Sequence, residues 1–227
     1  MLRKYIAIAI LTTLALSMSA RANNEDWVSL FDGITLDGWI QKNGKATYKV
    51  EDGAIVGTTA KNSPNSFLCT VNDYGDFELE FEVKLIDNQL NSGCQIRSQT
   101  KPTKKATDPV GRVNGPQVEI GASGDNGGQS GFIYGEACGG WMSSKESRKP
   151  QKIFKDGEWN KFRIVAQGAR IQTWINDQSI EDLKDEKHYK SHPEGFIGLQ
   201  VHGVGGKGPF QVAWRNIKIK PLKRNDK

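Results

Sequence analysis

Several segments of the chain alternate apolar and polar residues with the period of two that is typical of a β-strand with one buried face. The clearest run is 76–85, and comparable runs occupy 94–97, 115–120, 197–202 and 211–215. The period predicts a core-facing set of side chains: Phe77, Leu79, Phe81, Ile96, Val118, Ile120, Leu199 and Val201. The opposite face should carry Glu78, Arg97, Gln117, Glu119, Gln200 and His202. If these strands lie in one sheet, the polar side chains share a surface.

Turn signals separate these runs and define the fold class. Asp-Gly pairs at 32–33, 37–38, 52–53 and 156–157 mark tight reversals between short strands. No helical pattern extends beyond one or two turns. Roughly a dozen short strands with frequent turns predict an all-β antiparallel sandwich.

The N-terminus has the order of a secretory signal peptide. Positive charges at Arg3 and Lys4 precede an apolar stretch that ends at Ala20-Arg21-Ala22, an A-x-A cleavage pattern. We therefore expect residues 1–22 to be removed and the mature protein to be periplasmic or secreted. The rest reads as a single domain over 23–222, followed by a charged tail at 223–227.

Net charge limits the class of partner. Removing Arg3, Lys4 and Arg21 lowers the 31 basic residues to 28 against 26 acidic ones, so the formal charge falls from +5 to +2. This near-balance argues against a nucleic-acid partner. No second apolar run is long enough to span a bilayer. A polar sheet face with tryptophans in the intervening loops suits a neutral oligosaccharide or glycoside instead.

The cysteine count indicates neither a disulfide scaffold nor a metal site. Cys69, Cys94 and Cys138 have neither the density of a disulfide scaffold nor the spacing of a zinc site, so at most one disulfide is expected. The sequence predicts no cofactor. His and carboxylate spacing specifies no metal site, although a divalent metal stays open. The oligomeric state is also open.

A series of short motifs resembles the 3-keto-disaccharide hydrolase domain family over nearly all of the mature chain. In order they are Trp27-x-x-Leu30-Phe31-Asp32-Gly33, Leu36-Asp37-Gly38-Trp39, Asp76-Phe77-Glu78-Leu79, Asn91-Ser92-Gly93, Gly115-Pro116-Gln117-Val118-Glu119-Ile120, Gly157-Glu158-Trp159-Asn160, Gly198-Leu199-Gln200-x-His202-Gly203 and Trp214-Arg215-Asn216-Ile217. The resemblance implies a concanavalin-like jelly-roll sandwich of two antiparallel sheets and action on 3-keto-glycosides.

Such a substrate needs a base, because a carbonyl at C3 makes the C2 proton acidic and allows the C1 substituent to be expelled. We assign Glu119 as this base, His202 as acid or enolate donor, and Arg97 as electrostatic partner. The expected substrate-binding residues are Gln117, Gln200, Gln95, Glu78, Tyr134 and Trp141.

Two alternative functions remain open. A retaining glycosidase could use Glu78, Glu80 and Glu82, because residues two apart on a strand project on one face about 6.6 Å apart. A non-catalytic carbohydrate-binding module would instead stack sugar rings on tryptophans such as Trp141, Trp159 and Trp174. Sandwich folds serve both roles, so the fold alone does not decide between them.

Overall fold

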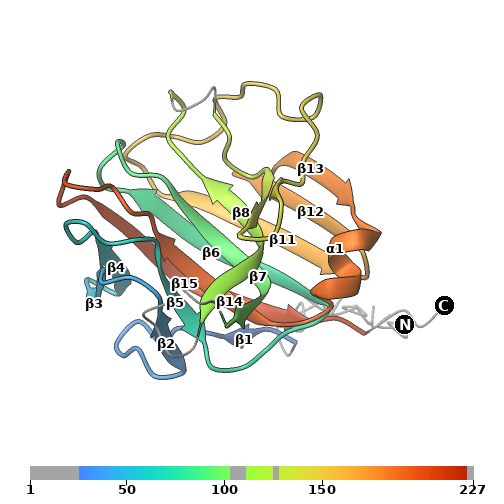
Figure 1. Ribbon diagram of the computed structural model, residues 1–227, viewed down its shortest axis with the longest axis horizontal. Coiled ribbons are helices and arrows are strands. Elements are labelled where there is room, and N and C mark those ends of the chain that lie inside the picture. The colour runs from blue at the N-terminus through green and yellow to red at the C-terminus, as the bar shows by residue number, and fades with distance from the viewer. Residues whose placement is uncertain (1–25, 103–110, 125–127, 224–227) are drawn as a thin grey trace, which may run out of the picture.

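The computed structural model of the protein describes residues 26–102, 111–124 and 128–223. The expected signal peptide and residues 224–227 of the expected tail lie outside the described residues. Figure 1 shows two sheets as layers, with β7, β8 and β14 in front of β6, β11 and β15. The prediction of an antiparallel sandwich is confirmed.

Sheet A is the eight-stranded layer. Along its path it contains β13 (Gln178–Lys184), β12 (Arg170–Ile175), β11 (Asn160–Gln167), β6 (Phe77–Leu85), β15 (Gln211–Pro221), β4 (Ala54–Thr58) and β3 (Thr47–Glu51), with β1 (Val28–Ser29) paired to β15.

Sheet B is the seven-stranded layer. Its order is β10 (Gly140–Trp141), β9 (Ile133–Glu136), β8 (Arg112–Ile120), β7 (Ser92–Lys101), β14 (Phe196–Val201), β5 (Ser66–Thr70) and β2 (Trp39–Lys42). One short helix, α1 (Glu186–Ser191), precedes β14. No helix among the described residues is long and apolar enough to cross a membrane.

The main core lies between the sheets, and the strand period places it correctly. Each of the eight side chains expected to face inward is at most 1% exposed. They join one continuous cluster with the apolar residues of both sheets. The alternation of buried and partly exposed positions along the whole of β6 shows why: one face packs on the core and the other meets solvent.

The expectation of one shared polar surface is wrong. The strands β6 and β15 belong to sheet A, whereas β7, β8 and β14 belong to sheet B. Since both sheets turn their apolar faces inward, their polar faces form the two opposite outer surfaces of the sandwich. Glu78 is therefore on the other side of the molecule from Glu119. The period of two fixes the face of a strand, but it carries no information on which sheet the strand joins.

Candidate functional site

A cleft of about 600 Å³ opens on the outer face of sheet B. Two rows of residues directly opposed across neighbouring strands build its floor, and such residues project on the same face. The first row runs through β14, β7 and β8: Gln200, Gly93 and Glu119. The second runs through β14, β7, β8, β9 and β10: Gly198, Gln95, Gln117, Tyr134 and Trp141. Antiparallel pairing thus gathers residues that are far apart in sequence.

Glu119 is a nearly buried carboxylate in this cleft, with 7% of its surface exposed. The Gln117 amide nitrogen Nε2 donates to its Oε1 at 2.5 Å. The Asn91 amide nitrogen Nδ2 donates to its Oε2 at 3.2 Å. A carboxylate offers about four lone-pair positions to donors, so this group can accept a proton or hydrogen bonds from several directions.

Gln117 is itself held from behind. Its Oε1 accepts from Gln95 Nε2 at 2.6 Å, and Gln95 Oε1 accepts from the Ser98 hydroxyl at 2.6 Å. Gln95 and Ser98 are fully buried and Gln117 is 2% exposed. Gln117 therefore lies beside Glu119 in the cleft. Gln95, which the sequence predicts to bind substrate, lies behind Gln117 and is not among the residues that line the cleft, which corrects its place among the substrate-binding residues.

Gln200 lines the cleft, and its amide has no partner among the described residues. It is 1% exposed, and neither its Oε1 nor its Nε2 makes a hydrogen bond to any described residue. A buried polar group left unsatisfied costs about 1–3 kcal/mol, so such groups are rare in folded proteins and call for an explanation. The Gln200 amide thus has donor and acceptor capacity beside the cleft that no described residue uses.

Aromatic side chains from β9 and β10 form one wall. Tyr134 and Trp141 both line the cleft and meet edge to face, with ring centres 5.4 Å apart. Arg148 covers one part of the indole, with its guanidinium carbon 4.2 Å from the ring centre. Trp141 keeps 38% of its surface exposed, so an apolar sugar face has room to contact it.

His202 follows the end of β14 and also lines the cleft, half-buried. The structure thus brings it together with Glu119, as the sequence predicted. Five further cleft residues had no predicted role: Asn65, Asn91, Arg112, Glu136 and Ala137. Arg112 Nη2 pairs with Glu136 Oε1 at 2.5 Å, across the start of β8 and the end of β9. Only Asn91 had a signal, because it belongs to the quoted Asn91-Ser92-Gly93 motif.

The assignment of Arg97 as electrostatic partner in the site is wrong. Its guanidinium donates to the carbonyls of Gly75 and Gly168 at 2.6 and 2.7 Å and to Asp76 Oδ1 at 2.8 Å, away from the cleft. The pairing of β7 with β8 shifts register between Gln95 and Gln99, and Arg97 has a φ of 48° there. This irregularity breaks the strand period, so the parity predicted for Arg97 does not hold.

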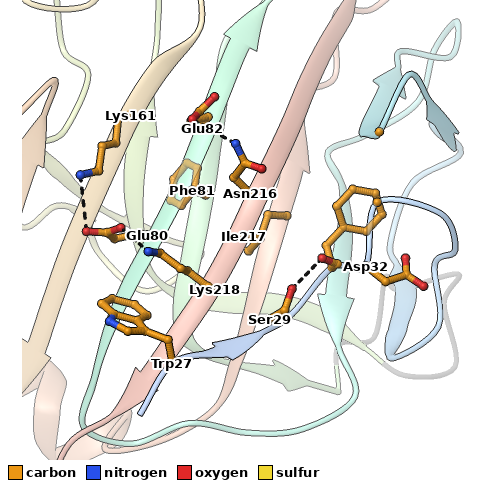
Figure 2. Close-up of a pocket in the computed structure, with 13 residues that line it drawn as sticks. Trp27, Ser29, Asp32, Glu80, Phe81, Glu82, Lys161, Asn216, Ile217 and Lys218 are labelled. Carbon is orange, nitrogen blue, oxygen red and sulfur yellow. Dashed lines mark hydrogen bonds and ion pairs between the residues drawn. The ribbon is translucent and has the colours of Figure 1, made fainter. Parts of the chain in front are cut away.

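The outer face of sheet A carries a separate hollow of about 670 Å³. Figure 2 shows Glu80 there between Lys161 and Lys218, at 3.6 and 3.0 Å. The other two β6 carboxylates are also paired: Glu78 with Arg163, and Glu82 with Arg215 at 2.7 Å. Glu78 therefore belongs to an ion-pair ladder and not to the cleft, which corrects its place among the substrate-binding residues.

The three cysteines are all free, so none forms the disulfide that the sequence left open. Burial raises the pKa of the Cys69 and Cys94 thiols far above the usual range of a cysteine. Burial also raises the pKa of the Cys138 thiol. These thiols are therefore poor nucleophiles. Within the described ranges, no three His, Cys, Asp or Glu side chains converge as they would around a metal ion.

Comparison with known proteins identifies both a family and a fold. The model of the 3-keto-alpha-glucoside-1,2-lyase-like domain matches residues 26–220. A putative glycosyl hydrolase from Parabacteroides distasonis superposes with a TM-score of 0.59 at 19% identity, over 88% of this chain and 95% of that chain. No curated protein matches the chain significantly in sequence.

Two other solved structures share the architecture. The carbohydrate-binding module CBM66 from Bacillus subtilis has a TM-score of 0.56 at 18% identity, over 81% of this chain and 95% of that chain. A β-glucanase from Bacillus licheniformis has a TM-score of 0.56 at 12% identity, over 87% and 97% of the two chains. At these identities the likeness concerns the fold, and the expected jelly-roll sandwich is confirmed.

Proposed function

The chain belongs to the family of 3-keto-alpha-glucoside-1,2-lyase-like domains, and on this premise we propose that it cleaves 3-keto-glycosides in the cleft on sheet B. The observation that carries the proposal is Glu119, a nearly buried carboxylate held by two amide donors. Around it the cleft offers amides, an imidazole and an aromatic wall. That set matches a hydroxyl-rich ligand of low charge.

Glu119 acts as the base in this mechanism. The carbonyl at C3 acidifies the C2–H bond, and the Glu119 carboxylate accepts that proton while the electron pair moves onto the C3 oxygen as an enolate. The enolate then re-forms the carbonyl, a C1–C2 double bond forms and the C1–O bond breaks. His202 supplies the proton to the departing oxygen.

The developing enolate needs a donor, and Gln200 is the group that fits. Both of its amide atoms are unpartnered among the described residues and shielded in the free cleft. Once the side chain turns toward the substrate, Nε2–H donates to the C3 oxygen and Oε1 accepts from a neighbouring hydroxyl. Gln200 thus takes the stabilising role that the sequence had suggested for Arg97. Addition of water to C1 of the enone, with return of a proton to C2, completes net hydrolysis without direct displacement at C1.

The test is Glu119→Gln on a 3-keto-glucoside, with Glu82→Gln as the matched control on sheet A. An amide keeps the size of the carboxylate but cannot accept the C2 proton. We therefore expect kcat to fall by about 10²–10⁴-fold with KM within a few fold. Glu82→Gln should keep near-wild-type turnover. Activity of Glu119→Gln within a few fold of wild type would remove Glu119 from the role.

The choice of substrate separates the other functions. Wild-type turnover of the parent glucoside, lost in Glu82→Gln, would support a conventional glycosidase instead. Binding of both sugars without turnover would support a carbohydrate-binding module, which the Tyr134–Trp141 wall also suits. Elimination and rehydration in heavy water should place deuterium at C2, whereas attack at C1 would leave C2 unlabelled.

A further inference from the structure

We propose that Ser98, Gln95 and Gln117 form a positioning chain that fixes the orientation of Glu119, and that Gly93 exists to make room for it. The inference rests on the proposed function, because it concerns how the base of that reaction is held. None of the three side chains needs to touch the substrate. They act through Glu119, so their loss should alter the chemical step more than substrate affinity.

The positioning chain of Ser98, Gln95 and Gln117 is continuous and almost completely buried. Three hydrogen bonds of 2.6, 2.6 and 2.5 Å lead from the Ser98 hydroxyl through Gln95 and Gln117 to Glu119 Oε1. Ser98 Oγ also lies 3.2 and 3.4 Å from the carbonyls of Ile96 and Pro116. A hydroxyl has one proton, and the shortest of its contacts is the one to Gln95.

The hydrogen bonds of the positioning chain all run in one direction, from Ser98 toward Glu119. A primary amide presents an acceptor on one side and donors on the other. Because Ser98 donates to Gln95 Oε1, the Gln95 nitrogen must face Gln117, and the Gln117 nitrogen must then face Glu119. If Gln117 were turned round, its oxygen would meet the carboxylate and the two sets of lone pairs would repel. The serine hydroxyl thus selects the amide orientation that suits an ionised carboxylate.

Gly93 supplies an independent observation. It lies between Gln200 and Glu119 in the first row of the floor, where any side chain would project into the cleft. A Cβ there would lie 2.4 Å from Gln117 Cδ and 2.7 Å from its Nε2. The backbone of Gly93 is not in the left-handed region, so its conformation does not require glycine. What requires glycine is the Gln117 amide lying across β7.

The consequence is a carboxylate fixed from both sides. Gln117 holds Oε1 and Asn91 holds Oε2, so the carboxylate plane cannot rotate freely in the cleft. Proton abstraction from carbon requires close alignment of base and C–H bond, and a misplacement of about 1 Å can cost about 10²-fold in rate. The buried amide chain provides this alignment from beneath the cleft.

A double-mutant cycle on Gly93→Ala and Gln117→Ala tests the proposal with a 3-keto-glucoside. Each single variant should lower kcat by about 10–100-fold with KM within a few fold. If Gly93 acts through Gln117, the double variant should be no worse than Gln117→Ala, because the added methyl then has nothing to displace. Gly206→Ala is the matched control, since a Cβ there meets no atom within 4 Å.

Gln95→Glu gives a second readout that a merely structural role would not move. The carboxylate introduced at position 95 accepts from Ser98 and cannot donate to Gln117. Gln117 must therefore donate to it, which reverses the Gln117 amide and turns the amide oxygen toward Glu119. The acidic limb of the kcat/KM profile should then move to higher pH, because the ionised base is disfavoured. If this variant does not fold, the Gly93–Gln117 cycle decides alone.

The outcomes separate the two proposals. Loss of turnover in Glu119→Gln, together with near-wild-type kcat in folded Gly93→Ala and Gln117→Ala, would overturn the positioning chain and leave the function intact. Full activity of Glu119→Gln would overturn both, because the chain would then orient a residue that does no chemistry. Additive losses in the cycle would also reject the role of Gly93, since they would show that it acts independently of Gln117.

Discussion

The guanidinium carbon of Arg215 lies 4.1 Å from the centre of the Trp159 ring. The same guanidinium donates to Glu82, and the arrangement repeats with Arg163 over Trp174 beside Glu78. A cation over an aromatic face occupies the surface on which a sugar ring would stack. Trp159 and Trp174 therefore serve the ion-pair ladder of sheet A. Trp141 also has a guanidinium over part of its ring, that of Arg148, but it lines the cleft on sheet B and keeps 38% of its surface exposed.

This contrast predicts different effects of removing each ring. Trp174→Ala should leave KM for a 3-keto-disaccharide within about twofold and lower the free energy of unfolding by about 1–3 kcal/mol through lost apolar burial. Trp141→Ala should raise KM by about tenfold, since an aromatic contact contributes about 0.5–1.5 kcal/mol beyond its buried area. Steady-state kinetics and urea unfolding check both. A large rise in KM for Trp174→Ala alone would place the sugar on sheet A.

Gln200→Leu should separate stability from function. The substitution replaces an unsatisfied buried amide by an apolar side chain of similar size, so the free energy of unfolding should stay equal or rise by about 1 kcal/mol. Turnover should nevertheless fall by about tenfold or more, because the proposed enolate donor is lost. Thermal unfolding and kcat on the same preparation give the answer. A destabilised but fully active variant would show that the amide serves the fold.

Arg97→Met should behave in the opposite way. Removing the guanidinium leaves the Asp76 carboxylate buried without its cation, a change that typically costs about 3–5 kcal/mol. We expect a lower midpoint of urea unfolding, with near-wild-type kcat for the fraction that remains folded at low temperature. Lys49→Met on strand β3 is a control for loss of a charge. Unchanged stability with abolished turnover would return Arg97 to the catalytic machinery.

How far the sequence predicts the site depends on the range of the interaction involved. The parity of Val118, Glu119 and Ile120 is local, since it follows from the strand period, and it is correct. The misplacement of Glu78 has a long-range cause. The pairing of β6 with β11 and β15 decides which sheet contains Glu78, and the sequence of β6 alone carries no signal of that pairing. The sequence predicts Gln200 as a substrate-binding residue. Whether its amide has a hydrogen-bond partner depends on all the residues around it, which the sequence does not specify.

Arg97 and Arg112 show two further limits. Arg97 sits in a regular polar position of its segment, and only the register shift beside it redirects the side chain. Arg112 meets Glu136 because β8 and β9 are neighbours, although a long stretch of chain separates the two residues. Neither the register shift at Arg97 nor the pairing of Arg112 with Glu136 is visible in the hydrophobic pattern of the sequence. The strand period nevertheless placed Glu119, Gln200 and His202 on one polar face, and all three line the cleft.

His192 should make stability depend on pH below neutrality. Burial lowers the pKa of His192 from 6.5, and Coulombic interactions with Lys101 and His188 lower it further. Its Nε2 lies 2.9 Å from Asn114 Oδ1 and its Nδ1 lies 2.8 Å from the Ser191 hydroxyl. The folded state therefore favours the neutral imidazole more strongly than the unfolded chain does, which takes up a proton near pH 6.5.

The sign follows from proton uptake. Below about pH 6.5 the unfolded state binds more protons than the folded state, so stability is complete above that pH and is lost as the pH falls toward the lowered folded pKa. Urea unfolding of the wild type between pH 8 and pH 5 should show this loss. In His192→Gln, which keeps polar contacts with Asn114 and Ser191 but cannot titrate, the decline attributable to this residue should vanish. An identical pH profile for both proteins would mean that His192 binds its proton equally well in the folded and unfolded states.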